Sequence, residues 1–242
     1  MTIDVAFLPR DLALRGDEQR VVVVFDVLRA TTSMTAALAA GIEEIRIFDS
    51  LAAAKQAAAE YEGARLLCGE ERCLRAEGFD LGNSPAEFTA DYAGKTVFMS
   101  TTNGTRAIVA ARGANTVLIG ALVNASEVAR AIVHFGRDVT LLCAGTNGVV
   151  AMEDILGAGA VIDALRQTHY VHLGSDGARI AVRLFHAARN DLRPALAQAQ
   201  GGQNVIRARL DADIDFAAAL DSLPLLGIVR PDPLRVNRLN LP

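Results

Sequence analysis

Short runs of β-branched and other apolar residues recur along the chain, and Ala-rich segments of helical length separate most of them. The apolar runs fall at residues 21–25, 45–48, 66–68, 97–99, 117–119 and 139–143. Continuous apolar runs are typical of strands buried on both faces, and their alternation with helices is typical of parallel sheets. The pattern predicts an α/β fold in which a mainly parallel sheet carries helices on both faces, a three-layer α/β/α arrangement.

The predicted helices include residues 31–41, 50–63 and 124–136. Two helices have recognisable starts. Ser50 is placed to cap the helix that runs through Tyr61. Ser84, Pro85 and Glu87 have the spacing of an N-cap residue, an N1 proline and a capping-box acid.

The C-terminal region has a different pattern, because helix-forming residues dominate from residue 151 to residue 220. We expect this region to be mostly helical, with breaks near residues 172–175 and 201–202. The proline-punctuated end, residues 228–242, predicts either an edge strand or an arm over a neighbouring molecule. No linker-like segment divides the chain, so we expect residues 1–242 to form a single domain, with a two-lobed organisation left open.

The tripeptide Thr-Asn-Gly occurs at residues 102–104 and again at 146–148, each time between an apolar run and a helix-like segment. The repeat indicates either an internal duplication or a generic strand-to-helix turn. Two matches this short are also compatible with chance.

The composition is that of a globular protein, with 242 residues of which 51% are hydrophobic and 21% charged. A net charge of −4 without a basic cluster argues against a nucleic-acid partner. No uncharged apolar stretch reaches about 18 residues, so we expect no membrane span. The N-terminal residues lack signal-peptide features, and we expect a cytoplasmic protein. The Ala-rich helices suit close packing inside the fold or across a dimer, and a homodimer is our expectation.

Polar residues cluster where several of the predicted strands end. The carboxyl ends of parallel strands meet at one edge of a sheet, where ligands bind in open α/β folds. We therefore expect one crevice to be lined by Asp26, Arg29, Thr31, Thr32, Glu70, Ser100, Thr101, Thr102, Asn103, Gly104, Arg106, Asn147, Glu153 and Asp154.

The residue types in this set point to a phosphoryl site assisted by a metal ion. Hydroxyl groups and helix-start N–H groups suit a phosphate, and Arg29 adds a bidentate clamp. Carboxylates beside an anion repel it unless a cation lies between them, and acidic oxygens together with phosphate are the usual ligands of Mg²⁺. We expect Asp26, Glu70 and Glu153 or Asp154 to bind Mg²⁺.

Simpler structural roles are also open to these residues. Asp26 and the two threonines that follow it are common helix-capping residues, and Arg29 alone is typical of a surface ion pair. Glu153 and Asp154 suit the first turn of a helix, where acids interact with the helix dipole. Adjacent helical residues point about 100° apart, so we expect only one of these two acids to face the crevice.

Five motifs, in order along the chain, resemble those of the 2-phosphosulfolactate phosphatase family. They read DVLRATT, GFDLGNSP (which contains Asn83), TTNGTRA, GALVNAS and CAGTNG, the last followed by AMED and GAG. The resemblance implies an α/β fold and Mg²⁺-dependent hydrolysis of 2-phosphosulfolactate to 3-sulfolactate and phosphate, which is a step of coenzyme M biosynthesis in methanogens. Family members also occur in bacteria without that pathway, so the resemblance leaves the physiological substrate open.

By this resemblance, Asp26 and Arg29 fall in the first motif of the family and Glu70 falls in its Gly-Glu element. Many family members have an arginine directly after this element. Here Glu71 occupies that position and Arg72 follows one residue later. The C-terminal stretch AQGGQNVIR keeps the glycines of a further family element but lacks its serine.

On this interpretation Mg²⁺ polarises the phosphoryl group, while Arg29 and the threonine-rich turns hold the phosphoryl oxygens. Arg106 is our candidate for binding the sulfonate or carboxylate of the substrate. The nucleophile is either metal-bound water, which we favour, or Asp26, which would form an aspartyl phosphate. Two alternatives stay open: a phosphatase for another small phosphorylated hydroxy acid, and a non-catalytic anion-binding protein.

Overall fold

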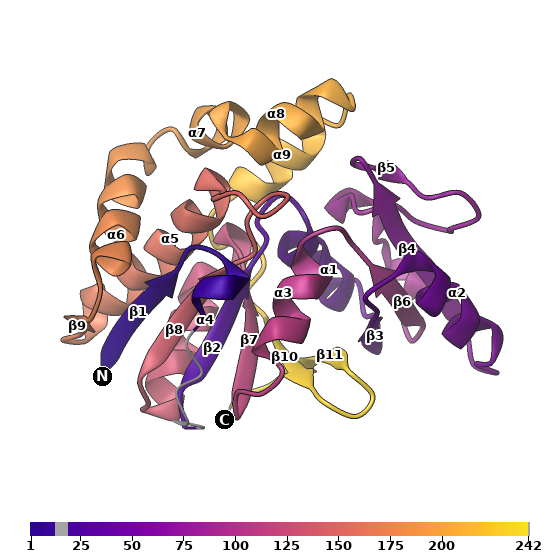
Figure 1. The fold of residues 1–242 in the computed structure, drawn as a ribbon, viewed down its shortest axis with the longest axis horizontal. Coiled ribbons are helices and arrows are strands. Elements are labelled where there is room, and N and C mark those ends of the chain that lie inside the picture. The colour runs from indigo at the N-terminus through magenta and orange to yellow at the C-terminus, as the bar shows by residue number, and fades with distance from the viewer. Residues whose placement is uncertain (13–18, 242) are drawn as a thin grey trace.

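The computed structural model describes residues 1–12 and 19–241. In this part of the chain helices cover one large sheet (Figure 1). The strands are β1 (Thr2–Ala6), β2 (Val21–Phe25), β3 (Glu44–Ile47), β4 (Arg65–Glu71), β5 (Leu74–Arg75), β6 (Thr96–Ser100), β7 (Thr116–Gly120), β8 (Val139–Cys143), β9 (His172–Leu173), β10 (Leu226–Arg230) and β11 (Arg235–Leu239). The α-helices are α1 (Ala30–Ala39), α2 (Leu51–Ala59), α3 (Gly104–Ala111), α4 (Ala125–Phe135), α5 (Met152–Thr168), α6 (Asp176–Ala188), α7 (Leu192–Gln198), α8 (Gln200–Arg207) and α9 (Ala212–Ala218).

The sheet has the strand order β5-β4-β6-β3-β11-β10-β7-β2-β8-β1-β9 and contains two parallel groups. One group is β4, β6 and β3, and the other is β7, β2, β8, β1 and β9. Between them, β10 and β11 pair antiparallel with each other, with β7 and with β3. Because three successive pairings are antiparallel, the two parallel groups run in opposite senses along the sheet.

Both faces of the sheet are covered, as the side chains of β2 show. Val21, Val23 and Phe25 pack into the apolar cluster formed with α4 and α5, whereas Val22 and Val24 pack with α1 and α3 on the opposite face. All five side chains are completely buried. A third, smaller cluster holds α2 against β6. The predicted three-layer α/β/α arrangement is confirmed.

Strand ends from the two groups converge although the groups run in opposite senses. Neighbouring strands in a sheet rotate by about 20–25°. Five steps separate β6 from β2 in the strand order, so the accumulated rotation is roughly 100–125°. The start of α3 after β6 thereby meets the start of α1 after β2, where a Cβ at Gly104 would collide with Ala30. Twist across the β10–β11 hairpin accounts for the convergence, so one crevice forms although the two parallel groups run in opposite senses.

The local predictions have mixed outcomes. The six apolar runs lie in or overlap strands. Ser50 caps α2, because its hydroxyl accepts a hydrogen bond from the N–H of Ala53 at 3.2 Å. The capping box predicted at Ser84 is wrong: only a short 3-10 helix follows, and the Ser84 side chain makes no capping bond. Glu87 instead accepts a hydrogen bond from the N–H of Gly82 at 2.8 Å.

The C-terminal strands occupy the middle of the sheet, so both predictions for the chain end, an edge strand and an arm, are wrong. Pro231 and Pro233 are confined to the turn between β10 and β11, where no ladder N–H is required. The break predicted near residues 201–202 is confirmed, since α7 ends at Gln198 and α8 begins at Gln200; the boundary is at Ala199, and both glycines lie inside α8. Within the described ranges, every helix falls short of the length and hydrophobicity that a membrane span requires.

The two Thr-Asn-Gly turns have different structures. Asn103 is the N-cap residue of α3, and Gly104 begins that helix directly. Asn147 and Gly148 both have positive φ, 53° and 77°, in a tight turn that ends before α5 begins at Met152. The two Thr-Asn-Gly segments therefore do not form the same type of turn.

Candidate active site

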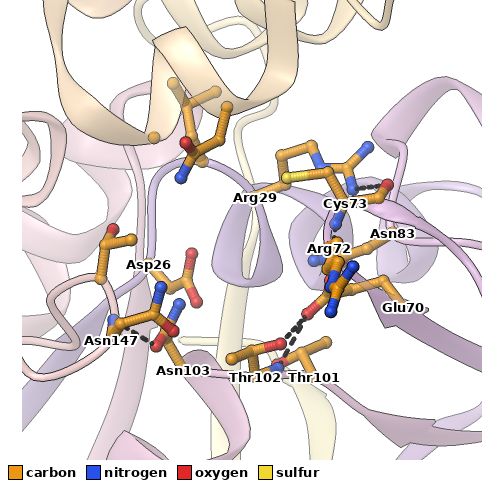
Figure 2. A pocket seen from close by; sticks show the side chains of 14 residues that line it. Asp26, Arg29, Glu70, Arg72, Cys73, Asn83, Thr101, Thr102, Asn103 and Asn147 are labelled. Atoms are coloured by element: carbon orange, nitrogen blue, oxygen red, sulfur yellow. Dashed lines mark hydrogen bonds between the residues drawn. The ribbon is translucent and has the colours of Figure 1, made fainter. Parts of the chain in front are cut away.

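A pocket of about 170 Å³ opens where β2, β4, β6 and β8 end, and α8 contributes residues to its wall (Figure 2). Of the residues predicted for a crevice, the lining includes Asp26, Arg29, Glu70, Thr101, Thr102, Asn103 and Asn147. It does not include Thr31, Thr32, Ser100, Gly104, Arg106, Glu153 or Asp154. Arg72 and Asn83 also line the pocket, as do Gly201 and Asn204 of α8.

Asp26 lies between the starts of two helices and is only 7% exposed. Its Oδ1 accepts a hydrogen bond from the N–H of Ala30 in α1 at 3.2 Å. Its Oδ2 faces the start of α3, 2.7 Å from the position that a Cβ at Gly104 would take, so only glycine fits there. Burial raises the pKa of Asp26 to about 6, with opposing contributions from the Ala30 N–H and Arg29, which lower it, and Glu70, which raises it. The N–H of Gly104 at the start of α3 also lowers this pKa, so the carboxylate interacts with both helix starts.

Thr31 and Thr32 bond to the main chain instead of facing the pocket. The Thr31 hydroxyl donates to the carbonyl of Asp26 and accepts from its N–H, both at 3.0 Å. The Thr32 hydroxyl donates to the carbonyl of Val27 at 2.7 Å. Both threonines are completely buried, so they fix the loop that carries Asp26.

Glu70 joins the loop after β4 to the loop after β6. Its Oε1 accepts hydrogen bonds from the N–H and the hydroxyl of Thr102 at 2.8 and 2.6 Å, and its Oε2 accepts from the N–H of Cys73 at 3.0 Å (Figure 2). Thr101 lines the pocket, whereas Ser100 lies behind it at the buried end of β6. Because donors of the protein occupy both Glu70 oxygens, the geometry favours a positioning role for this acid.

Arg29 is held in place by a carboxylate that the sequence did not reveal. Its Nη1 lies 2.6 Å from Oδ2 of Asp213 on α9 and 3.0 Å from the hydroxyl of Ser84. Its Nη2 donates to the carbonyl of Cys73 at 2.5 Å (Figure 2). Both charged partners are buried, so the surface ion pair considered for Arg29 is wrong. The guanidinium has further N–H donors for a ligand in the pocket.

Asp213 is the clearest functional candidate that sequence reasoning missed. It lies 184 residues from Arg29 and on a short helix, away from every strand end. The only signal in the sequence is an aspartate beside Ile214 and four positions before Ala217, both of which are buried. A carboxylate on the buried face of a helix needs a partner, and Arg29 is that partner.

Asp154 ties together two of the loops around the site. Its two oxygens accept hydrogen bonds from the N–H groups of Val27 and Gly145, each at 2.9 Å. It is 2% exposed, and burial raises its pKa well above the ordinary range, with further contributions from the Asp26 and Glu153 charges. Asp154 therefore holds the ends of β2 and β8 together.

Glu153 differs from its neighbour in having an oxygen without a partner. It is 1% exposed, its Oε1 lies against Gly201 of α8, and its Oε2 has no hydrogen-bond partner among the described residues. Burial, followed by the nearby charge of Asp26, raises the pKa of Glu153 to about 7. Of the two adjacent acids, Glu153 is thus the one with coordination capacity left.

Side-chain amides and arginines complete the surroundings. The N–H of Asn147 donates to Oδ1 of Asn103 at 3.0 Å, which joins the two Thr-Asn-Gly turns (Figure 2). Arg72 reaches the pocket despite its displacement by one residue from the family pattern. Arg106 lies instead in a neighbouring hollow, which it lines together with Arg10.

The fit of these residues to Mg²⁺ is partial. In residues 1–12 and 19–241, no three His, Cys, Asp or Glu side chains are gathered closely enough to hold a metal ion. Glu70 and Asp154 are engaged with donors of the protein, whereas Asp26 lines the pocket and Glu153 keeps a free oxygen. Mg²⁺ usually takes one or two carboxylates together with waters and a substrate phosphate, and Asp26 and Glu153 fit that donor set.

Fold and site together define an α/β protein with a small polar pocket at converging strand ends. The pocket combines hydroxyl, amide and arginine donors with a buried carboxylate. Donors of this kind suit a small oxyanion, and the carboxylate provides a group that can react or bind a cation.

Comparison with known proteins agrees with this class. The family model described as 2-phosphosulpholactate phosphatase matches residues 7–232. A protein of Carboxydothermus hydrogenoformans, named "Probable 2-phosphosulfolactate phosphatase", is 38% identical over 239 residues, which cover 99% of this chain and 96% of the relative. A protein of the same name from Synechococcus sp. (strain CC9605) is 40% identical, over 95% and 96% of the two chains. The chain belongs to the 2-phosphosulfolactate phosphatase family, and hence to the phosphoric monoester hydrolases.

Proposed function

We propose that the chain hydrolyses 2-phosphosulfolactate to 3-sulfolactate and phosphate, with Mg²⁺ as its cofactor. The observation that carries the proposal is the position of Asp26, a buried carboxylate at the pocket wall between the starts of α1 and α3. Helix starts attract phosphate groups, so the substrate and Asp26 are drawn to the same place. Two anions in one small pocket call for a cation between them.

Donors for the phosphoryl oxygens come from several sides of the pocket. Thr101 lies just before the start of α3, Asn147 also lines the pocket, and Arg29 is oriented by its ion pair with Asp213. Charge-assisted bonds from a guanidinium are about twice as strong as neutral ones. In this proposal Thr31, Thr32, Ser100 and Gly104 act from behind the lining and keep the loops in position.

Asp26 and Glu153 are the ligands that we propose for Mg²⁺. When bound, the ion would neutralise charge on the phosphoryl oxygens and lower the barrier to nucleophilic attack on the phosphorus. Glu70 and Asp154, which were predicted as ligands, hold four loops around the site through main-chain N–H groups. We propose that these two acids position the site without binding the ion.

Water is the nucleophile that we favour over Asp26. Oδ1 of Asp26 already accepts a hydrogen bond from Ala30, and the raised pKa of about 6 leaves a fraction of the carboxyl protonated near neutral pH. Both features reduce the capacity of Asp26 to attack phosphorus. Mass spectrometry of acid-quenched enzyme tests the choice, since a phosphorylated Asp26 would overturn it.

The function is tested by phosphate release from a panel of esters. Purified protein is incubated with 2-phosphosulfolactate, 2-phospholactate and phosphoglycerate, each with Mg²⁺ and with EDTA. We expect release to be fastest from 2-phosphosulfolactate and to need Mg²⁺. Faster release from another ester would replace the substrate and keep the chemistry. Binding without release from any ester would favour an anion-binding protein.

Three further proposals follow from the sequence and the family. We propose a cytoplasmic homodimer, and a role in coenzyme M biosynthesis where that pathway exists. Light scattering on purified protein tests the assembly, since a homodimer has twice the chain mass of 25.6 kDa. A mass of one chain would contradict it.

A further inference from the structure

A groove that carries two arginines opens from the central pocket, and the phosphoryl chemistry leaves it without a role. Arg72 and Arg207 both line the groove. The groove shares Arg72, Cys73, Asn147 and Asn204 with the central pocket, so the two form one continuous hollow. A ligand group attached to the phosphoryl ester can therefore enter the groove directly.

The face of α8 that borders the pocket continues into this groove. Gly201 and Asn204 line the pocket, and Arg207 follows at the same three-residue spacing. Residues at this spacing lie on one side of a helix, and six positions correspond to about 9 Å along its axis. Nη1 of Arg207 donates to Oδ1 of Asn204 at 3.2 Å, which holds the arginine along this face.

Arg72 supplies the second positive charge from the opposite wall, in the turn between β4 and β5. The turn is anchored to Glu70, whose Oε2 accepts from the N–H of Cys73 at 3.0 Å. Neither Arg72 nor Arg207 forms an ion pair with a described carboxylate, and no acidic residue of the described chain lines the groove. The groove is thus a concentration of positive charge without a counterion from the described residues.

We propose that Arg72 and Arg207 bind the sulfonate of the substrate and make the enzyme selective for sulfonated esters. The inference rests on the proposed function and names the residues that bind the sulfonate of that substrate. A sulfonate stays ionised at all physiological pH values and presents three acceptor oxygens, which suits guanidinium groups on two sides. In the substrate the sulfonate lies only a few bonds from the phosphorus. Because the groove adjoins the phosphoryl pocket, the sulfonate can enter the groove while the phosphoryl group occupies the pocket.

The hollow with Arg10 and Arg106 is the weaker candidate, although Arg106 was the arginine expected from sequence. This hollow shares only Asn103 and Asn147 with the central pocket. The wider junction between pocket and groove therefore assigns the sulfonate to Arg72 and Arg207.

The experiment compares two substrates that differ in the sulfonate, 2-phosphosulfolactate and 2-phospholactate. Arg207→Gln and Arg72→Gln are measured beside Arg106→Gln and a control, Arg183→Gln, which removes the same charge from an exposed position on α6. We expect both groove variants to raise KM for 2-phosphosulfolactate about tenfold, as loss of one partly exposed charged contact predicts. For Arg207→Gln, whose side chain does not line the central pocket, KM for 2-phospholactate should change less than about twofold.

Turnover by the unaltered protein tests the proposed function, and the ratio between the two substrates tests the groove. Equal losses on both substrates in Arg207→Gln, or a selective loss in Arg106→Gln alone, would overturn the inference. Calorimetric titration with 3-sulfolactate keeps the two questions separate, because it needs no turnover. Weaker binding in Arg207→Gln than in Arg183→Gln supports the groove, and equal binding refutes it.

Discussion

Replacing Glu153 by glutamine should stabilise the protein at pH 8 and have little effect at pH 5. The carboxylate is 1% exposed, and its Oε2 has no partner among the described residues. Glutamine keeps an oxygen for the contact with Gly201 and removes the charge. An ionised carboxylate in such a place opposes folding, whereas a protonated one or an amide does not.

The magnitude follows from the pKa of Glu153, which burial raises from 4.5 to about 7. Each pH unit of difference between folded and unfolded states corresponds to about 1.4 kcal/mol. The folded pKa is the higher one, so the wild type loses stability as pH rises from 4.5 through 7, by about 3 kcal/mol in full. Between pH 5 and pH 8 we expect the gap between Glu153→Gln and wild type to widen by about 2–3 kcal/mol.

Urea unfolding of both proteins at pH 5 and pH 8, in EDTA, measures this gap. The matched control is Asp154→Asn, which should be destabilising at both pH values because an amide cannot accept from both Val27 and Gly145. A gap that does not change with pH, or a Glu153→Gln variant that is less stable at pH 8, would refute the reasoning. Mg²⁺ in place of EDTA should then stabilise the wild type more than the variant if Glu153 is a ligand.

Two further substitutions test the walls of the pocket. Asp213→Asn leaves the Arg29 charge buried without its partner, so the free energy of unfolding in urea should fall by about 3–5 kcal/mol. The control Asp215→Asn, an exposed position on the same helix, should lower it by less than about 1 kcal/mol. Equal effects of the two substitutions would contradict a buried ion pair. Gly104→Ala puts a methyl group 2.7 Å from the carboxylate of Asp26, so kcat/KM for phosphate release should fall at least about tenfold. Unchanged kinetics would show that the start of α3 is not packed against this acid.

Sequence reasoning predicted the elements whose burial follows from the local pattern of apolar and polar residues. Four consecutive valines followed by phenylalanine specify β2, because each side chain is buried on one face or the other. The serine at residue 50 caps α2 through a contact only three residues away. Interactions of this range depend on neighbours in the sequence and can be read from them.

The features that sequence reasoning missed depend on contacts between distant residues. Strands β10 and β11 read as a loose end because their polar positions, such as Arg235 and Asn237, suit a surface; in the structure they bridge the two parallel groups. Asp213 became recognisable only through Arg29, 184 residues away. Likewise Glu70 and Asp154 have the chemistry of metal ligands, and only their main-chain partners show that their oxygens are occupied.

The central claim is that Asp26 and the donors around it form the phosphoryl site, and one kinetic comparison tests it most directly. Phosphate release from 2-phosphosulfolactate is measured with Mg²⁺ for the wild type and for Asp26→Asn, whose amide can still accept from the N–H of Ala30. The account predicts that kcat/KM falls at least about 10³-fold while the urea midpoint does not fall. A folded variant that keeps activity within about tenfold of the wild type would contradict it.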